Sequence, residues 1–209
     1  MGTDIDLVGS GELASALRIE HTVAGERNAF TIELADGRNL TEQTVGLVLN
    51  RHHPPSQPLA TEDDREYAYE ESLALFASWM NCLPGPVLNR PVGSGPRGPY
   101  RSPAQWRTLA RRAGFETRDP WDAGIEVTEE RPTMYALLLY GESVGVELPA
   151  ELRDAARALC QRTQTELVEI RLVAGTEGWT FTDASLDADL RLGGDALLAR
   201  LRELARTAS

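Results

Sequence analysis

The chain has 209 residues, 42% of them hydrophobic and 25% charged, a balance that suits one large globular domain or two small ones. Its formal net charge is −11, and because an acidic surface repels phosphate backbones, nucleic-acid binding is not expected. All 21 basic residues are arginine. This excludes chemistry that needs a lysine, such as a Schiff base or a P-loop clamp on ATP phosphates.

The cysteine pattern and the hydropathy favour a cytoplasmic protein. Cys82 and Cys160 lie in apolar, helix-like stretches outside any CxxC motif, which indicates reduced thiols that pack in a core. Residues 1–13 lack the basic and apolar segments of a signal peptide, and no apolar stretch reaches 18 residues. We therefore expect no signal peptide and no membrane association.

The first hundred residues predict an N-terminal α/β domain. Phe30, Ile32 and Leu34 alternate with polar residues and predict a half-buried strand, which Asp36-Gly37 would end in a hairpin turn. The continuous apolar run 44–49 predicts a central strand covered on both faces.

A long helix is predicted from about residue 61 to Cys82, with acidic residues in its first turn. Its inner stripe contains Leu73, Phe76, Trp79 and Met80. Residues 87–88 form a further short strand. We expect residues 45–49 and 87–88 to be interior parallel strands, and we expect this helix to cover them with Phe76 and Trp79.

The glycine- and proline-rich stretch 91–101 is the best candidate for a linker or mobile loop. After it, Ser102 and Gln105 form a capping box with Pro103 at the first helical position, and Gly114 is a natural stop for that helix. We therefore place a domain boundary between residues 1–100 and 101–209.

The second half predicts a smaller α+β subdomain. Strands are expected at residues 133–140 and 143–146, joined by a tight turn, and again at 167–174 and 179–183. Helices are expected after Pro149 and after residue 194. The order hairpin, helix, hairpin, helix is typical of α+β packing.

The tetrapeptide Val-Leu-Asn-Arg occurs twice, each time at the end of an apolar strand. Strand ends face the ligand crevice in an open parallel sheet, so the two Asn-Arg pairs predict a site for a carboxylate or phosphate group. The alternative is that the asparagines cap turns and the arginines pair with the acidic surface. The predicted ligand-binding residues, including arginines of the adjoining loop, are Asn50, Arg51, Asn89, Arg90, Arg97 and Arg101.

Three further patterns in the sequence are weaker signals of a binding site. Gly9 and Gly11 begin a GxGxxA dinucleotide pattern after a strand-like run, but an ordinary strand-to-helix turn explains it better because no acidic residue follows at the right place on a second strand. His52-His53 lacks the further ligands that a metal site needs. Asp183 and Asp187 are the remaining metal candidates, although such a cluster is more often a solvated loop.

The order of these parts resembles the ATP-grasp superfamily with its preceding pre-ATP-grasp domain. The segments PVLNRP and SPAQW, separated by a glycine-rich stretch, are similar to the pre-ATP-grasp region of peptide-modifying ATP-grasp ligases. In the second half, residues 167–173, 181–185 and 190–204 resemble two strands and the closing segment of the last grasp subdomain. The resemblance implies Mg·ATP as cofactor and ligation of a carboxylate to an amine.

Several residues depart from the pattern that this resemblance implies. The first metal-binding aspartate of the family falls on or near Arg171, and its Glu-x-Asn pair falls on Asp183-x-Ser185. The lysines that clamp ATP have no counterpart. The stretch between Tyr100 and Thr133 is too short for the central nucleotide-binding subdomain.

These departures lead to the main hypothesis, a degenerate and non-catalytic ATP-grasp-like protein without a cofactor. It would bind a peptide, small molecule or partner protein in a peptide-modification or natural-product pathway. One alternative is an active, divergent ligase that uses Mg·ATP with arginines on the phosphates. Another is a dinucleotide-binding enzyme. A homodimer is compatible with each hypothesis.

Overall fold

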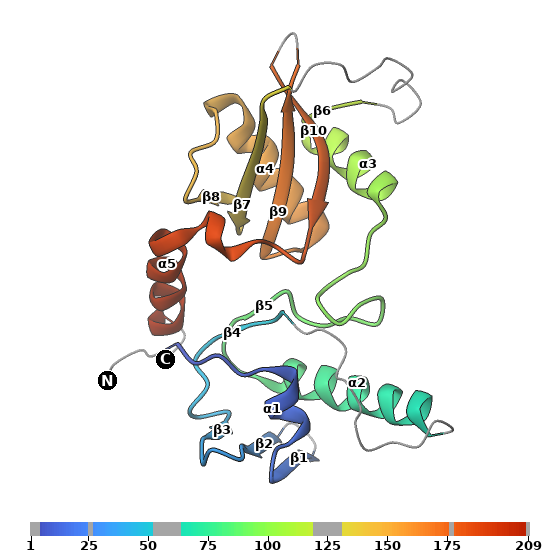
Figure 1. The fold of residues 1–209 in the computed structure, drawn as a ribbon, viewed down its shortest axis with the longest axis vertical. Helices are drawn as coiled ribbons and strands as arrows, with labels where there is room; N and C mark the ends of the chain where they lie inside the picture. The colour runs from blue at the N-terminus through green and yellow to red at the C-terminus, as the bar shows by residue number, and fades with distance from the viewer. Residues whose placement is uncertain (1–4, 25–26, 52–63, 119–130, 176–177, 208–209) are drawn as a thin grey trace. The chain divides into compact units, whose positions relative to one another are not determined.

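The computed structural model describes residues 5–24, 27–51, 64–118, 131–175 and 178–207 (Figure 1). The chain divides into two compact units, residues 1–98 with 201–209 and residues 99–200. Each unit is described by itself. No helix among the described residues is long and apolar enough to cross a membrane.

The first unit contains an antiparallel sheet in the order β1-β2-β3 and the long helix α2. Phe30 and Ile32 of β2 are buried as the alternation predicts, and they form one core with Phe76 and Trp79 of α2. The ring of Trp79 meets Phe30 edge-on, with 5.5 Å between the ring centroids. The elements are α1 (Ser10–Ala14), β1 (Arg18–Ala24), β2 (Arg27–Glu33), β3 (Asn39–Thr41) and α2 (Arg65–Cys82).

The predicted parallel strands exist but are shorter and less central than expected. β4 (Val48–Leu49) pairs in parallel with β5 (Val87–Leu88), so the predicted direction is confirmed. Among the described residues the sheet has only these two strands, however, so neither is an interior strand and that prediction is wrong. Of the apolar run 44–49, only Val48 and Leu49 are strand, while Val45 packs from the preceding loop against the core that contains Phe76 and Trp79 of α2.

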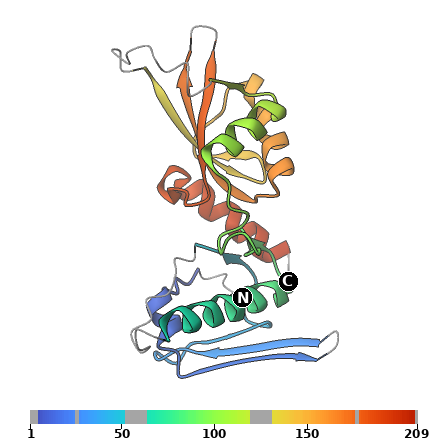
Figure 2. The same cartoon turned by 90° about the vertical axis from the view of Figure 1, so that its right-hand side faces the viewer.

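The second unit is a five-stranded sheet in the order β6-β10-β9-β7-β8, with helices α3 and α4 against one face (Figure 2). The helix α5 (Gly194–Thr207) follows a short 3-10 turn, η2 (Leu190–Leu192); it begins in this unit, and its residues from Leu201 onward belong to the first unit. The other elements are α3 (Pro103–Ala113), β6 (Glu116–Thr117), β7 (Thr133–Leu139), β8 (Glu142–Val144), α4 (Ala150–Thr163), β9 (Leu167–Ala174) and β10 (Trp179–Ser185).

Local sequence signals explain most of this unit. The hydroxyl of Ser102 accepts a hydrogen bond from the backbone N–H of Gln105, whose own side chain accepts one from the N–H of Ser102, so the capping box at the start of α3 is confirmed. Gly114 ends the helix with φ of 103°, a conformation that favours glycine. The alternation along β9 places Val168, Ile170 and other apolar side chains in the core beneath α3 and α4.

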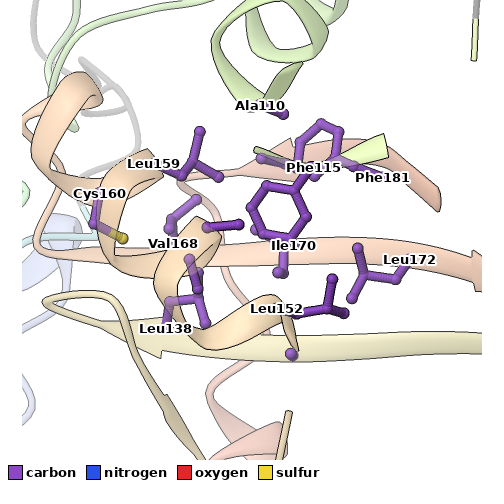
Figure 3. Close-up of a cluster of buried hydrophobic side chains, with 14 of the residues drawn as sticks. Ala110, Phe115, Leu138, Leu152, Leu159, Cys160, Val168, Ile170, Leu172 and Phe181 are labelled. Carbon is purple, nitrogen blue, oxygen red and sulfur yellow. The ribbon is translucent and has the colours of Figure 1, made fainter. Parts of the chain in front are cut away.

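That core is shown in Figure 3. Phe115 and Phe181 lie with their ring centroids 5.5 Å apart, and Leu138, Leu159 and Ile170 are fully buried around them. The fold is therefore a mixed α/β structure with an N-terminal α/β unit and a C-terminal α+β unit, as the sequence predicts.

Candidate functional site

The asparagines of the two Asn-Arg pairs lie at the same end of the β4-β5 sheet, whereas the arginines that follow them do not share one environment. Val48 is opposite Val87 in the register, so Asn50 and Asn89 both leave the sheet at the same end. Both asparagines are almost completely buried. The Nδ2 atom of Asn50 donates hydrogen bonds to the backbone oxygens of Asn89, at 2.8 Å, and of Pro96, at 2.7 Å. The side chain of Asn50 thus ties the strand ends to the glycine- and proline-rich loop.

The backbone conformation at residue 89 favours an asparagine. Its φ is 57°, in the left-handed region that asparagine tolerates better than most residues. A tight turn follows a few residues later, where the backbone N–H of Val92 bonds to the oxygen of Gly95.

The arginines that follow the two asparagines have different environments. Arg90 donates hydrogen bonds to the backbone oxygens of Met80 and Gly85, at the end of α2. A positive charge there is favourable because the carbonyls at the C-terminal end of a helix carry partial negative charge. Arg51 is exposed, and Arg97 is half-buried in the loop.

Arg101, in the second unit, also contacts backbone carbonyls. It donates to the oxygen of Thr163, the last residue of α4, at 2.5 Å and to that of Pro99 at 3.1 Å. Its guanidinium lies 5.2 Å from the centre of the Trp106 ring. Burial lowers the pKa of Arg101, and these contacts hold its charge in a structural position.

A second group of polar residues lies on the sheet face opposite α3 and α4. Tyr135 of β7, Arg171 of β9 and Asp183 of β10 form one row across three neighbouring strands, because Arg171 is the register partner of both other residues. All three side chains are exposed. The guanidinium of Arg171 lies 5.8 Å from the centre of the Tyr135 ring, within the range of a cation–π contact.

A β-bulge brings Asp183 onto this face. The register moves from Phe181 opposite Leu172 directly to Asp183 opposite Arg171, and the hydroxyl of the extra residue, Thr182, donates to the oxygen of Arg171 at 3.1 Å. In a regular strand without the bulge, Asp183 would lie on the same face as Phe181, two residues before it, and would point toward the helices. The bulge therefore decides which charges meet.

The metal candidates do not form a ligand set. The hydroxyl of Ser185 accepts a hydrogen bond from the backbone N–H of Asp187, which fits a turn. Asp189, the next carboxylate along the chain, binds Arg191 at 2.7 Å. Within the described part of the chain, no group of three or more histidine, cysteine, aspartate or glutamate side chains could hold a metal ion. With Arg171 beside Asp183, these residues do not fit a Mg²⁺ ion.

The dinucleotide interpretation of the N-terminal glycines is wrong in its structural context. Residues 5–9 form no strand, and α1 has only five residues. The backbone N–H of Gly9 donates a hydrogen bond to the carboxylate of Glu12 at 2.6 Å. The Glu12 side chain therefore occupies the position at the start of α1 that a bound phosphate would need. His52 and His53 lie outside the described residues.

Sequence reasoning missed two contacts. It did not anticipate the contact between Tyr135 and Arg171, although both occur at alternating positions of predicted strands. It also did not anticipate the contact between His21 and Cys82, in which the Nε2 atom of His21 lies 3.4 Å from the sulfur of Cys82. Neither contact has a local signal, because each joins residues far apart in the chain.

No protein-family model and no curated protein matches the sequence. Solved structures do match. The macrocyclase MdnC from Microcystis aeruginosa MRC, bound with the precursor peptide MdnA, has a TM-score of 0.64 at 10% identity, over 89% of this chain and 86% of that chain. The macrocyclase MdnB from the same strain has a TM-score of 0.60 at 11% identity, over 91% and 81%.

A third match is the ATP-grasp ligase PsnB complexed with a phosphomimetic variant of its minimal precursor, Mg and ADP. Its TM-score is 0.60 at 12% identity, over 91% of this chain and 85% of that chain. Identities this low establish the fold alone. The chain is thus similar in fold to ATP-grasp ligases, and the resemblance predicted from the sequence is confirmed at that level.

Proposed function

We propose that this chain is a peptide-binding protein that keeps an ATP-grasp fold without ligase activity, in a peptide-modification or natural-product pathway. The observation that carries the proposal is the row of Arg171 and Asp183 on the exposed face of the second unit. The resemblance to the ligases assigns metal-binding carboxylates to these two positions, and here one of them is a fixed positive charge.

The charge at Arg171 opposes metal binding for a simple electrostatic reason. Guanidinium stays protonated at all accessible pH values, so it cannot become a ligand as a lysine or histidine could. It also repels a divalent cation beside Asp183. Phosphoryl transfer relies on metal and cationic groups to neutralise charge on the phosphates, and the chain contains no lysine to compensate.

Peptide binding is proposed because the structural neighbours include complexes with peptides. MdnC was solved with the precursor peptide MdnA, and PsnB with its minimal precursor. A protein that loses the catalytic groups can retain the surface that recognises a peptide. The same retained surface could instead bind a small molecule or a partner protein.

Isothermal titration of the full chain with Mg·ATP tests the loss of activity. We expect no heat of binding and no release of ADP when a mixed pool of acidic and amine-bearing peptides is added. A panel of displayed random peptides, selected on the immobilised protein, tests the retained recognition. Turnover of Mg·ATP would contradict the proposal, and so would a selection that yields no enriched sequence.

The second candidate is an active, divergent ligase that forms a carboxylate–amine bond. It is favoured by the fold and by the neighbours solved with Mg and ADP or with AMPPNP. In this case arginines would bind the phosphates, which their planar, bidentate geometry allows. Micromolar binding of Mg·ATP with ADP release would select this candidate over the first.

A further inference from the structure

In the three-stranded sheet of the first unit, β1 is an exposed edge strand. β1 pairs with β2 along all seven of its residues, and it pairs with no other strand in the part of the chain that the structure describes. Six of its seven side chains are exposed, and only His21 is half-buried. Alternate residues of such a strand direct their backbone N–H and C=O groups away from the sheet, where they can pair with another strand.

Among the residues that the structure describes, this edge lacks the devices that normally prevent pairing. Proteins protect edge strands with proline, lysine, bulges or charges that point toward the core face. β1 contains no proline or lysine, and its pairing with β2 shows no register shift. Its two charged residues, Arg18 and Glu20, neutralise each other in an ion pair of 2.5 Å.

The face of β1 toward α2 is apolar and incompletely covered. Ile19, His21 and Val23 lie on the same face as Phe30 and Ile32, which are buried. Ile19 remains 45% exposed and Val23 61% exposed, although both belong to the apolar layer of the sheet. The layer is therefore open at this edge, and another strand would extend it.

We propose that β1 is the interface of a homodimer in which the strands of two copies pair antiparallel about a two-fold axis at His21. This register uses the whole strand and sets Ile19 opposite Val23 of the partner subunit, twice. It sets Arg18 opposite Ala24 and Glu20 opposite Thr22, so no like charges face each other directly. An isologous interface of this kind requires a self-complementary strand, and β1 has that property.

The proposed dimer has a continuous six-stranded sheet with both copies of α2 on the same face. Its interface is limited to two strands and the apolar rim beside them. We therefore expect weak to moderate affinity, in the range of about 1–100 µM, rather than an obligate dimer. The inference does not depend on the proposed function, since it concerns only the first unit.

Sedimentation equilibrium of the full chain over about a hundredfold range of concentration tests this proposal. We expect a monomer–dimer equilibrium that Val23→Lys weakens at least about tenfold, because the substitution puts a charge into the apolar contact. Val146→Lys is the matched control, since Val146 is an exposed valine in the second unit. Circular dichroism of both variants checks that they are folded.

Disulfide cross-linking tests the register in a Cys82→Ser background. Ile19→Cys and Val23→Cys chains, mixed and oxidised, should form a heterodimeric cross-link that neither variant forms alone. A wild-type chain that stays monomeric throughout the range overturns the proposal, as does equal weakening by the two lysine variants. Binding of an unrelated extended peptide at β1 of a monomeric chain would also overturn it.

Discussion

Replacing Arg171 by aspartate should create a divalent-metal site on the exposed face of the second unit. Arg171 is the register partner of Asp183, so Arg171→Asp would set two carboxylates side by side on neighbouring strands. Cross-strand neighbours place their side-chain groups about 5 Å apart, a spacing that one hydrated cation can bridge. The wild-type pair offers a cation one attractive and one repulsive charge.

The magnitude follows from Coulomb's law with the screening of an exposed site. Two unit charges about 5 Å apart in water interact with about 0.8 kcal/mol. The substitution changes the local charge by two units, and the cation carries two charges, so the binding free energy improves by about 3 kcal/mol. This corresponds to an affinity increase of about a hundredfold.

Electron paramagnetic resonance of free Mn²⁺ measures this binding directly, with Mn²⁺ as the stand-in for Mg²⁺. Arg171→Gln is the control for charge removal alone, and it should give about half the free-energy gain, or roughly a tenfold effect. Adding Asp183→Asn to Arg171→Asp should reverse most of the gain. Wild-type binding as tight as that of Arg171→Asp would refute the reasoning that the arginine disables this site.

Three further predictions concern stability and thiol chemistry. Gly145→Ala should lower the free energy of unfolding by at least about 2 kcal/mol, measured by urea denaturation, because φ is 85° and an added Cβ would lie 2.0 Å from the backbone oxygen of Leu192. Gly114→Ala, where φ is 103° and an added Cβ would make only an ordinary contact of 3.8 Å with the Cβ of Ala155, should cost only about 1 kcal/mol. Burial raises the pKa of the Cys160 thiol from 9.0 to about 11, so Cys160 should contribute stability below pH 9 that is lost as the pH rises toward 11. In the native protein at neutral pH, Ellman's reagent should modify Cys82 but not Cys160, and equal rates for the two thiols would contradict this.

The sequence predicted the elements whose signals are local. The capping box at Ser102 and Gln105 acts within one helical turn, and Gly114 ends that helix by its own backbone freedom. The alternation along residues 167–174 also reports directly on which face each side chain occupies. In each case the residues that carry the signal are close in the chain to the structure they specify.

The sequence misled where the partner was distant. The apolar run 44–49 looked like a covered strand, but hydrophobicity alone does not distinguish a strand from a loop that packs under a helix. The bulge at Thr182 also has no signal in β10 itself, because it exists only in the pairing with β9. The contacts of Arg90 and Arg101 could not be predicted from the sequence either, since the carbonyls that they contact belong to the ends of α2 and α4.

The architecture of the second unit separates the charges on its exposed face from the packing of its core. Alternation along β9 directs Ile170 and Leu172 into the core while Arg171, between them, points to the opposite and exposed face. The fully buried ring of Phe181 is likewise only two residues from the exposed Asp183. A substitution on the exposed face therefore changes the charges available to a ligand and leaves the packing beneath the helices intact.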